Sequence, residues 1–200
     1  MPIENPVTAE IAAAAARMVA EEGLEYGPAK RRALRQLGLP KQAALPSNDE
    51  LEDEVRDYLA LFCADTQPGE LLVLRRLAAQ WMARLAEFRP HLCGAVWRGT
   101  ATRLSDIHLQ LFCDDSKSAE IALINMSIDY EVGEAQGLRG EAVDMLVLAA
   151  PCREFGETVS IALSILDYDA QRGALKPDGR GRSERGDLAA LRKLLDQEPT

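Results

Sequence analysis

The strongest constraint on the fold is a change in hydrophobic periodicity at Pro90. Before this residue, apolar side chains recur at three- and four-residue steps, which is typical of amphipathic helices. After it, apolar and polar residues alternate in short runs separated by glycines, which is typical of strands and tight turns. Helices followed by strands predict an α+β fold. We therefore expect a helical N-terminal region over residues 1–90 and an α+β domain over residues 91–200, packed together as one compact unit.

The first ninety residues contain the signals of four helices. Cap, proline and glycine positions place these helices at 8–22, 28–38, 47–62 and 68–88. Thr8 is the expected cap of the first one. Ser47 and Glu50 have the spacing of a capping box at the start of the third. In the fourth helix, Trp81 and Phe88 belong to an apolar stripe, which predicts that this helix packs against the sheet.

Beyond Pro90 the pattern predicts one mixed or antiparallel sheet. The expected strands are 94–99, 106–113, 128–133, 142–150 and 157–167, with a short helix at 118–126. Gly156 marks a hairpin, so the last two strands are expected to pair antiparallel. The polar, glycine-rich segment 173–186 indicates a flexible connection. A closing C-terminal helix follows it and carries Leu188, Leu191 and Leu195.

The composition narrows the function classes. Apolar residues make up 47% of the chain and charged residues 28%, which is ordinary for a soluble globular protein. The net charge of -9 and the pI near 4.8 argue against a general nucleic-acid-binding surface. No segment approaches the roughly 20 apolar residues of a membrane span, and the N-terminus lacks the features of a signal peptide. We expect no membrane partner and a cytoplasmic location.

The cysteines are not arranged as metal ligands in the sequence. They are widely spaced and form no CxxC pair, and each has apolar neighbours: Cys63, Cys93, Cys113 and Cys152. A free cysteine in such surroundings behaves as a small hydrophobic residue. We therefore expect four free thiols that act as small hydrophobic residues and not as metal ligands.

The strongest candidates for catalytic or ligand-binding residues lie in the segment Gly99–Leu109. The strand expected at 94–99 runs into Gly99 and Thr100, and the next strand opens with Ser105-Asp106-Ile107-His108-Leu109. Because side chains in a strand alternate between its two faces, one face should carry the polar residues and the other the apolar ones. The expected polar face carries Asp106, His108 and Gln110.

These pieces resemble the nucleotidyltransferase superfamily of the DNA polymerase β type, over about residues 70–150. In that family a glycine and a hydroxyl residue at the end of a strand hold a nucleoside triphosphate. Two carboxylates two residues apart bind Mg2+, and a third carboxylate comes from a neighbouring strand. The resemblance implies that Gly99, Thr100 and Arg103 contact the triphosphate, and that Asp106 and Asp144 are catalytic carboxylates bound to Mg2+. Glu141 and Asp129 are the alternatives to Asp144.

His108 stands where the resemblance implies the second carboxylate. The implied metal ligands are then Asp106, Asp144 and His108, although Mg2+ prefers oxygen ligands. The loop between Thr100 and Asp106 is also shorter than is usual in the family. Both differences from the family pattern argue against ordinary catalysis by two metal ions.

Three readings of the function remain open. The first is an enzyme that transfers a nucleotidyl group from a nucleoside triphosphate to an acceptor. The second is a catalytically inactive module of the same fold, for nucleotide sensing or for interaction with a protein partner. The third is a structural α+β protein in which Thr100 and Asp106 only satisfy backbone groups at a turn and a strand end.

Two basic clusters lie outside the motif. Lys30, Arg31, Arg32 and Arg35 share the second predicted helix, where a solvated helix face is the expected role. Arg180, Arg182 and Arg185 fall in the segment 173–186. They either cover a polyanionic ligand or belong to a disordered connector.

Overall fold

The computed structural model of the chain describes residues 6–171 and 181–197. These residues form two units. The helical unit comprises the chain up to Glu70 together with Thr100–Ser105, and the sheet unit comprises Leu71–Gly99 and the chain from Asp106 on. The division therefore falls inside a long helix near residue 70, whereas the sequence analysis places a boundary at residue 90. In the described ranges no helix is long and apolar enough to span a membrane.

The helical unit is built around α1 (Pro6–Glu22), α2 (Tyr26–Gln36) and α3 (Asn48–Phe62). α1 packs against both other helices. Their shared core is formed by alanines and larger apolar side chains, among them Ile11, Leu51 and Val55, which are fully buried. The expected capping box is confirmed, because Ser47 Oγ accepts a hydrogen bond from the backbone N–H of Glu50 and Glu50 Oε2 accepts one from that of Ser47. Thr8 is not the cap of α1, since this helix already begins at Pro6.

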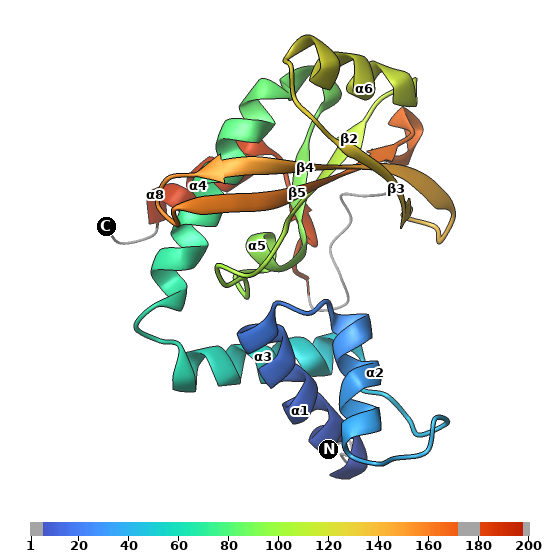
Figure 1. Cartoon of the computed structure of the whole chain (residues 1–200), viewed down its shortest axis with the longest axis vertical. Helices are drawn as coiled ribbons and strands as arrows, with labels where there is room; N and C mark the ends of the chain where they lie inside the picture. Colours follow the sequence, from blue (N-terminus) through green and yellow to red (C-terminus); the bar gives the residue numbers. More distant parts are fainter. Residues whose placement is uncertain (1–5, 172–180, 198–200) are drawn as a thin grey trace. The chain divides into compact units, whose positions relative to one another are not determined.

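The sheet unit contains a mixed sheet of six strands in the described residues, in the order β3-β4-β5-β2-β1-β6 (Figure 1). The pair β2·β5 is parallel and the other neighbours are antiparallel, as expected for the hairpin β4·β5 at Gly156. The strands are β1 (His91–Cys93), β2 (Ile107–Phe112), β3 (Glu131–Gln136), β4 (Ala142–Cys152), β5 (Glu157–Leu166) and β6 (Arg185–Gly186). The fold class is α+β, as predicted.

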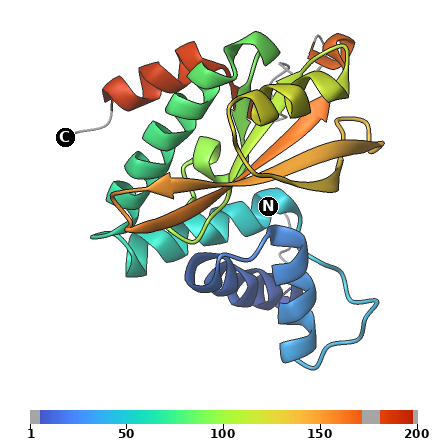
Figure 2. The same ribbon diagram turned by 45° about the horizontal axis from the view of Figure 1, so that its top comes forward.

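The helices of the sheet unit agree with the sequence signals at most positions. They are α4 (Gln67–Arg84) from Leu71 on, η1 (Ala86–Phe88), α5 (Gly94–Arg98), α6 (Ser116–Asn125), η2 (Tyr168–Ala170) and α8 (Leu188–Gln197). The apolar stripe of α4 is buried, with Trp81 only 5% exposed. Both ribbon views show α4 and α8 side by side (Figures 1 and 2).

The strand expected at 94–99 is wrong, because residues Gly94–Arg98 form the short helix α5. The strand lies earlier, at β1, and ends where Gly94 adopts a positive φ of 70°. Arg75 of α4 stabilises the helix, since its guanidinium donates to the carbonyl oxygens of Val96 and Trp97, each at 3.1 Å. The last carbonyl oxygens of a helix have no hydrogen-bond donor within the helix. Arg75 therefore supplies donors that the residues of α5 themselves lack.

Two further expectations need correction. The strand expected at 128–133 begins three residues later, as β3. Part of the connection expected at 173–186 lies outside the described residues, but Arg185 and Gly186 are not a connector, because they pair with β1 as the edge strand β6.

Candidate functional site

The polar face predicted for β2 is present in the structure. Ile107, Leu109 and Leu111 are fully buried, whereas the alternate residues His108 and Gln110 are half-buried and Asp106 is exposed. The two sets project from opposite faces of the sheet. Asp106 directly precedes β2 and His108 lies within it, so the motif occupies the start of this strand.

Strand register gives His108 two neighbours on this face. It lies opposite Cys93 of β1 and opposite Ala162 of β5. Cys93 in turn lies opposite Arg185 of β6. Residues in register project to the same side of a sheet. Arg185, Cys93 and His108 therefore form one line across three strands, which we call the polar row.

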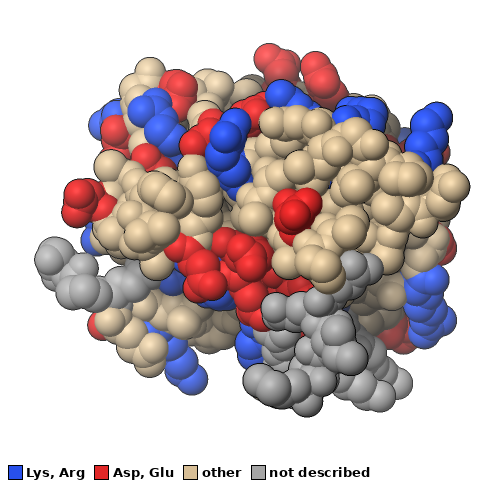
Figure 3. Space-filling model, turned by 90° about the horizontal axis from the view of Figure 1, so that it is seen from below, with Lys and Arg blue, Asp and Glu red and all other residues tan. Residues whose placement is uncertain are grey.

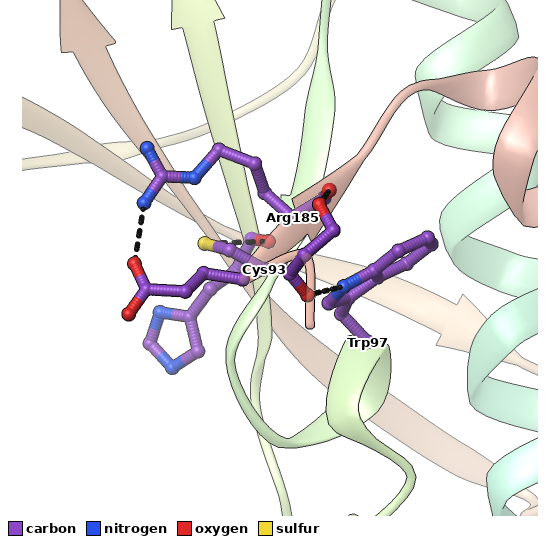
Figure 4. A network of polar contacts seen from close by, with 6 residues as sticks. Cys93, Trp97 and Arg185 are labelled. Atoms are coloured by element: carbon purple, nitrogen blue, oxygen red, sulfur yellow. Dashed lines mark hydrogen bonds and ion pairs between the residues drawn. The ribbon is translucent and has the colours of Figure 1, made fainter. Parts of the chain in front are cut away.

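The polar row is held by hydrogen bonds at the edge of the sheet (Figure 4). Cys93 Sγ lies 3.5 Å from the carbonyl oxygen of His108, to which it donates. Trp97 of α5 donates from Nε1 to the carbonyl oxygen of Ser183 at 2.7 Å. The Ser183 hydroxyl donates to the carbonyl oxygen of Arg185. The bonds of Trp97 and Ser183 join the start of β6 to α5, and strand pairing joins β6 to β1, so that both contacts position the backbone of Arg185.

Gly94 is the glycine at the end of a strand, and the sequence analysis did not select it. It follows β1 directly, and a Cβ built at this position would lie 3.3 Å from Cδ2 of His108. The next residue is Ala95, which has no hydroxyl. The signal that could have identified Gly94 is its place after the short apolar run that ends at Cys93.

Gly99 and Thr100 do not end a strand, which corrects the expectation for this pair. Gly99 terminates α5 in the left-handed conformation, with a φ of 86°. Thr100 belongs to the helical unit and is 2% exposed, and its Oγ1 has no hydrogen-bond partner among the described residues. Arg103, in the same unit, is exposed and donates its backbone N–H to Glu70 Oε2 at 2.9 Å.

Asp144 does not join Asp106, which corrects the expected pair of catalytic carboxylates. In β4 it shares a face with Leu146, which lies opposite Leu163 of β5, and Leu163 lies opposite Leu109. Asp144 is therefore on the apolar face of the sheet, opposite to Asp106. The register also offsets the two residues by about 16 Å along the strands.

The residues around His108 do not fit a Mg2+ site. Mg2+ requires several oxygen ligands in near-octahedral geometry, and the motif offers one carboxylate, Asp106, and one imidazole. Ala162, the neighbour of His108 on β5, has no donor atom. Within the part of the chain that the structure describes, no group of three His, Cys, Asp or Glu residues could hold a metal ion.

A second group of carboxylates lies at the other end of β2. Asp114 and Asp115 follow this strand, and Asp167 follows the parallel strand β5. Burial raises the pKa of the Cys113 thiol, and the charges of Asp115, Asp114 and Asp167 raise it further. This thiol therefore stays protonated at neutral pH and is a poor nucleophile.

Two residues of the basic cluster on α2 have partners within the helical unit. Lys30 Nζ donates to the carbonyl oxygen of Pro46 and to Oδ1 of Asn48, and Arg32 pairs with Glu22. Burial lowers the pKa of Lys30, while the charge of Glu50 opposes this effect. On the face drawn in Figure 3, basic and acidic side chains are interspersed, and one central group is acidic.

Comparisons with known proteins give partial structural likenesses. No protein-family model matches the sequence, and no curated protein matches it. A crystal structure of the Cid1 poly(U) polymerase with MgGTP bound has 16% identity and a TM-score of 0.34, covering 48% of this chain and 32% of that chain. A structure of Cid1 with the UTP analogue UMPNPP has 18% identity, a TM-score of 0.34, and coverages of 48% and 30%. The chain thus spans about a third of the length of these structures, and TM-scores this low assign neither a family nor an activity.

Proposed function

We propose that this chain is a nucleotidyltransferase-like protein whose sheet unit binds a nucleoside triphosphate without transferring its nucleotidyl group. The observation that carries the proposal is the placement of exposed Asp106 and half-buried His108 two residues apart on one face at the start of β2. The motif lies at the start of β2, opposite the end of the short strand β1, but it has one carboxylate where catalysis by paired metal ions needs several.

The surroundings of His108 support loss of catalysis rather than a rearranged metal centre. The ring lies beside Gly94, at the strand end where a nucleotidyltransferase holds phosphate groups. The register neighbours Cys93 and Ala162 supply no oxygen ligand. Asp144 is on the other face of the sheet, so it cannot complete the set.

Binding measurements with the full chain test this function. Each of the four ribonucleoside triphosphates is titrated calorimetrically, once in EDTA and once in MgCl2, and pyrophosphate release is measured in parallel. We expect at least one nucleotide to bind in EDTA, with a Kd within about tenfold of that in MgCl2, and no release of pyrophosphate. Magnesium-dependent pyrophosphate release would overturn the proposal in favour of an enzyme.

Two matched variants separate binding from metal chemistry. Asp106→Asn should leave nucleotide binding in EDTA intact, because no metal bridges this carboxylate and the phosphates. Asp144→Asn is the control on the opposite face and should change neither measurement. If all four nucleotides fail to bind to the wild-type chain, the interaction module for a protein partner is the better account.

A further inference from the structure

The two-residue strand β6 places a buried guanidinium on the functional face. Arg185 is 8% exposed and lies opposite Cys93, at the end of the polar row. Gly186 follows it and packs under the ring of Trp97. The backbone of β6 is thus held from two directions, by strand pairing with β1 and by packing of Gly186 against α5.

The charge of Arg185 is only partly balanced. Its Nη2 lies 3.0 Å from Oε2 of Glu184, and the Glu184 side chain is 59% exposed. Arg185 Nε is buried and has no hydrogen-bond partner among the described residues. A buried guanidinium needs anionic or hydrogen-bonding partners, because removal of its charge from water is costly. The exposed carboxylate of Glu184 contacts Nη2 of Arg185, and the N–H donor at Nε has no partner among the described residues.

A second polar atom on the same face is also without a partner. Gln110 lies two residues after His108 in β2, and its Oε1 is buried with no hydrogen bond in the described part of the chain. Gln110 and His108 are thus further polar groups on the same face of the sheet as Arg185. Because the Glu184 side chain is exposed, the guanidinium of Arg185 is closest to solvent where it contacts Glu184.

We propose that Arg185 binds a phosphate group of the ligand, and that this phosphate displaces Glu184 from the guanidinium. The inference rests on the proposed function and names the residue that supplies the positive charge. A planar guanidinium donates two parallel hydrogen bonds to phosphate oxygens, and it is charged at every accessible pH. Arg185 would thereby balance phosphate charge on a face whose residues do not fit Mg2+.

Inorganic tripolyphosphate and the ribonucleoside triphosphates are the probes, titrated into the full chain in EDTA. Arg185→Gln should weaken binding of both probes at least tenfold, and Arg185→Lys should weaken it less, because an ammonium keeps the charge but loses the paired geometry. Arg192→Gln is the matched control: this arginine is exposed on α8, so the same change in net charge should leave both Kd values unchanged. Circular dichroism and thermal unfolding report whether each variant is folded.

Glu184→Gln keeps the test decisive if Arg185→Gln does not fold. This change removes an exposed competitor of the phosphate, and it should tighten tripolyphosphate binding about threefold or more. Equal affinities of the wild type, Glu184→Gln and a folded Arg185→Gln would overturn the role of Arg185 while nucleotide binding stood. Arg185-dependent binding of tripolyphosphate without binding of any nucleotide would overturn the proposed function but keep the anion site. No binding of either probe would overturn both.

Discussion

The ring of Trp97 occupies the space that a Cβ on Gly186 would fill. The same indole donates from Nε1 to the carbonyl oxygen of Ser183, so α5 contacts β6 through both packing and a hydrogen bond. This contact joins two segments far apart in the sequence. Because Arg185 is adjacent to Gly186, the position of the proposed phosphate-binding residue depends on a glycine that has no side chain.

Gly186→Ala should displace β6 from Trp97. Overpacking of a filled site costs about 1–3 kcal/mol, and the displaced Arg185 should also lose its affinity for tripolyphosphate. Chemical denaturation and calorimetry measure the two effects. Gly69→Ala is the control, because a Cβ there meets no atom within 4 Å and alanine favours a helix over glycine. Unchanged stability of Gly186→Ala would show that Trp97 does not hold β6.

His108→Asp should restore a pair of carboxylates two residues apart at the start of β2. We expect Mg2+ to strengthen binding of a nucleoside triphosphate to this variant by about tenfold, or ~1.4 kcal/mol, since two carboxylates and the phosphate oxygens suit a hard cation. Calorimetry with and without MgCl2 measures the change. The same enhancement in the wild-type chain would contradict the account of His108 as the residue that removes the metal site.

Trp81→Ala should strongly destabilise the sheet unit. Trp81 is 5% exposed in α4, and the guanidinium of Arg84 lies 4.3 Å from its ring centroid. Replacing a buried tryptophan by alanine costs about 3–5 kcal/mol. Phe62→Ala is the control, because Phe62 is 65% exposed and should change the free energy of unfolding by less than about 1 kcal/mol. A loss for Trp81→Ala as small as that of the control would show that α4 does not pack through this ring.

Ser47→Ala should destabilise α3 and change its response to acid. Loss of an N-cap serine costs about 1 kcal/mol. The backbone and side chain of Ser47 lower the pKa of Glu50, so the ionised carboxylate stabilises the folded state above its ordinary pKa of about 4.3. That stabilisation is lost as the pH falls through the lower, folded-state pKa.

The measurement is chemical denaturation of the wild type and Ser47→Ala between pH 7 and pH 3. The difference in stability between the two proteins should narrow as Glu50 becomes protonated. Asp57→Asn, on an exposed position of the same helix, is a control without a capping role. A constant difference across this range would show that the Ser47 hydroxyl does not stabilise the charge of Glu50, because the backbone N–H of residue 47 is present in both proteins.

The two faces of β2 could be predicted from the sequence, because they depend on the residues of this one strand alone. The alternation of Asp106 and His108 with Ile107 and Leu109 places them on two faces whatever the rest of the sheet does. The assignment of Gly99 to a strand end was wrong because a five-residue helix and a buried strand look alike in a short apolar run. Arg75, far away in the chain, decides between them by donating to the carbonyls of α5.

The sequence by itself determined the fold class, the capping box of Ser47 and Glu50, and the two faces of β2, since each depends on residues close together in the chain. Only the tertiary structure decided that Asp144 lies on the face opposite to Asp106 and that Arg185 joins Cys93 and His108 in one row. The physical reason is strand pairing: a shift of one residue in register exchanges the faces, and register is set by contacts between distant segments.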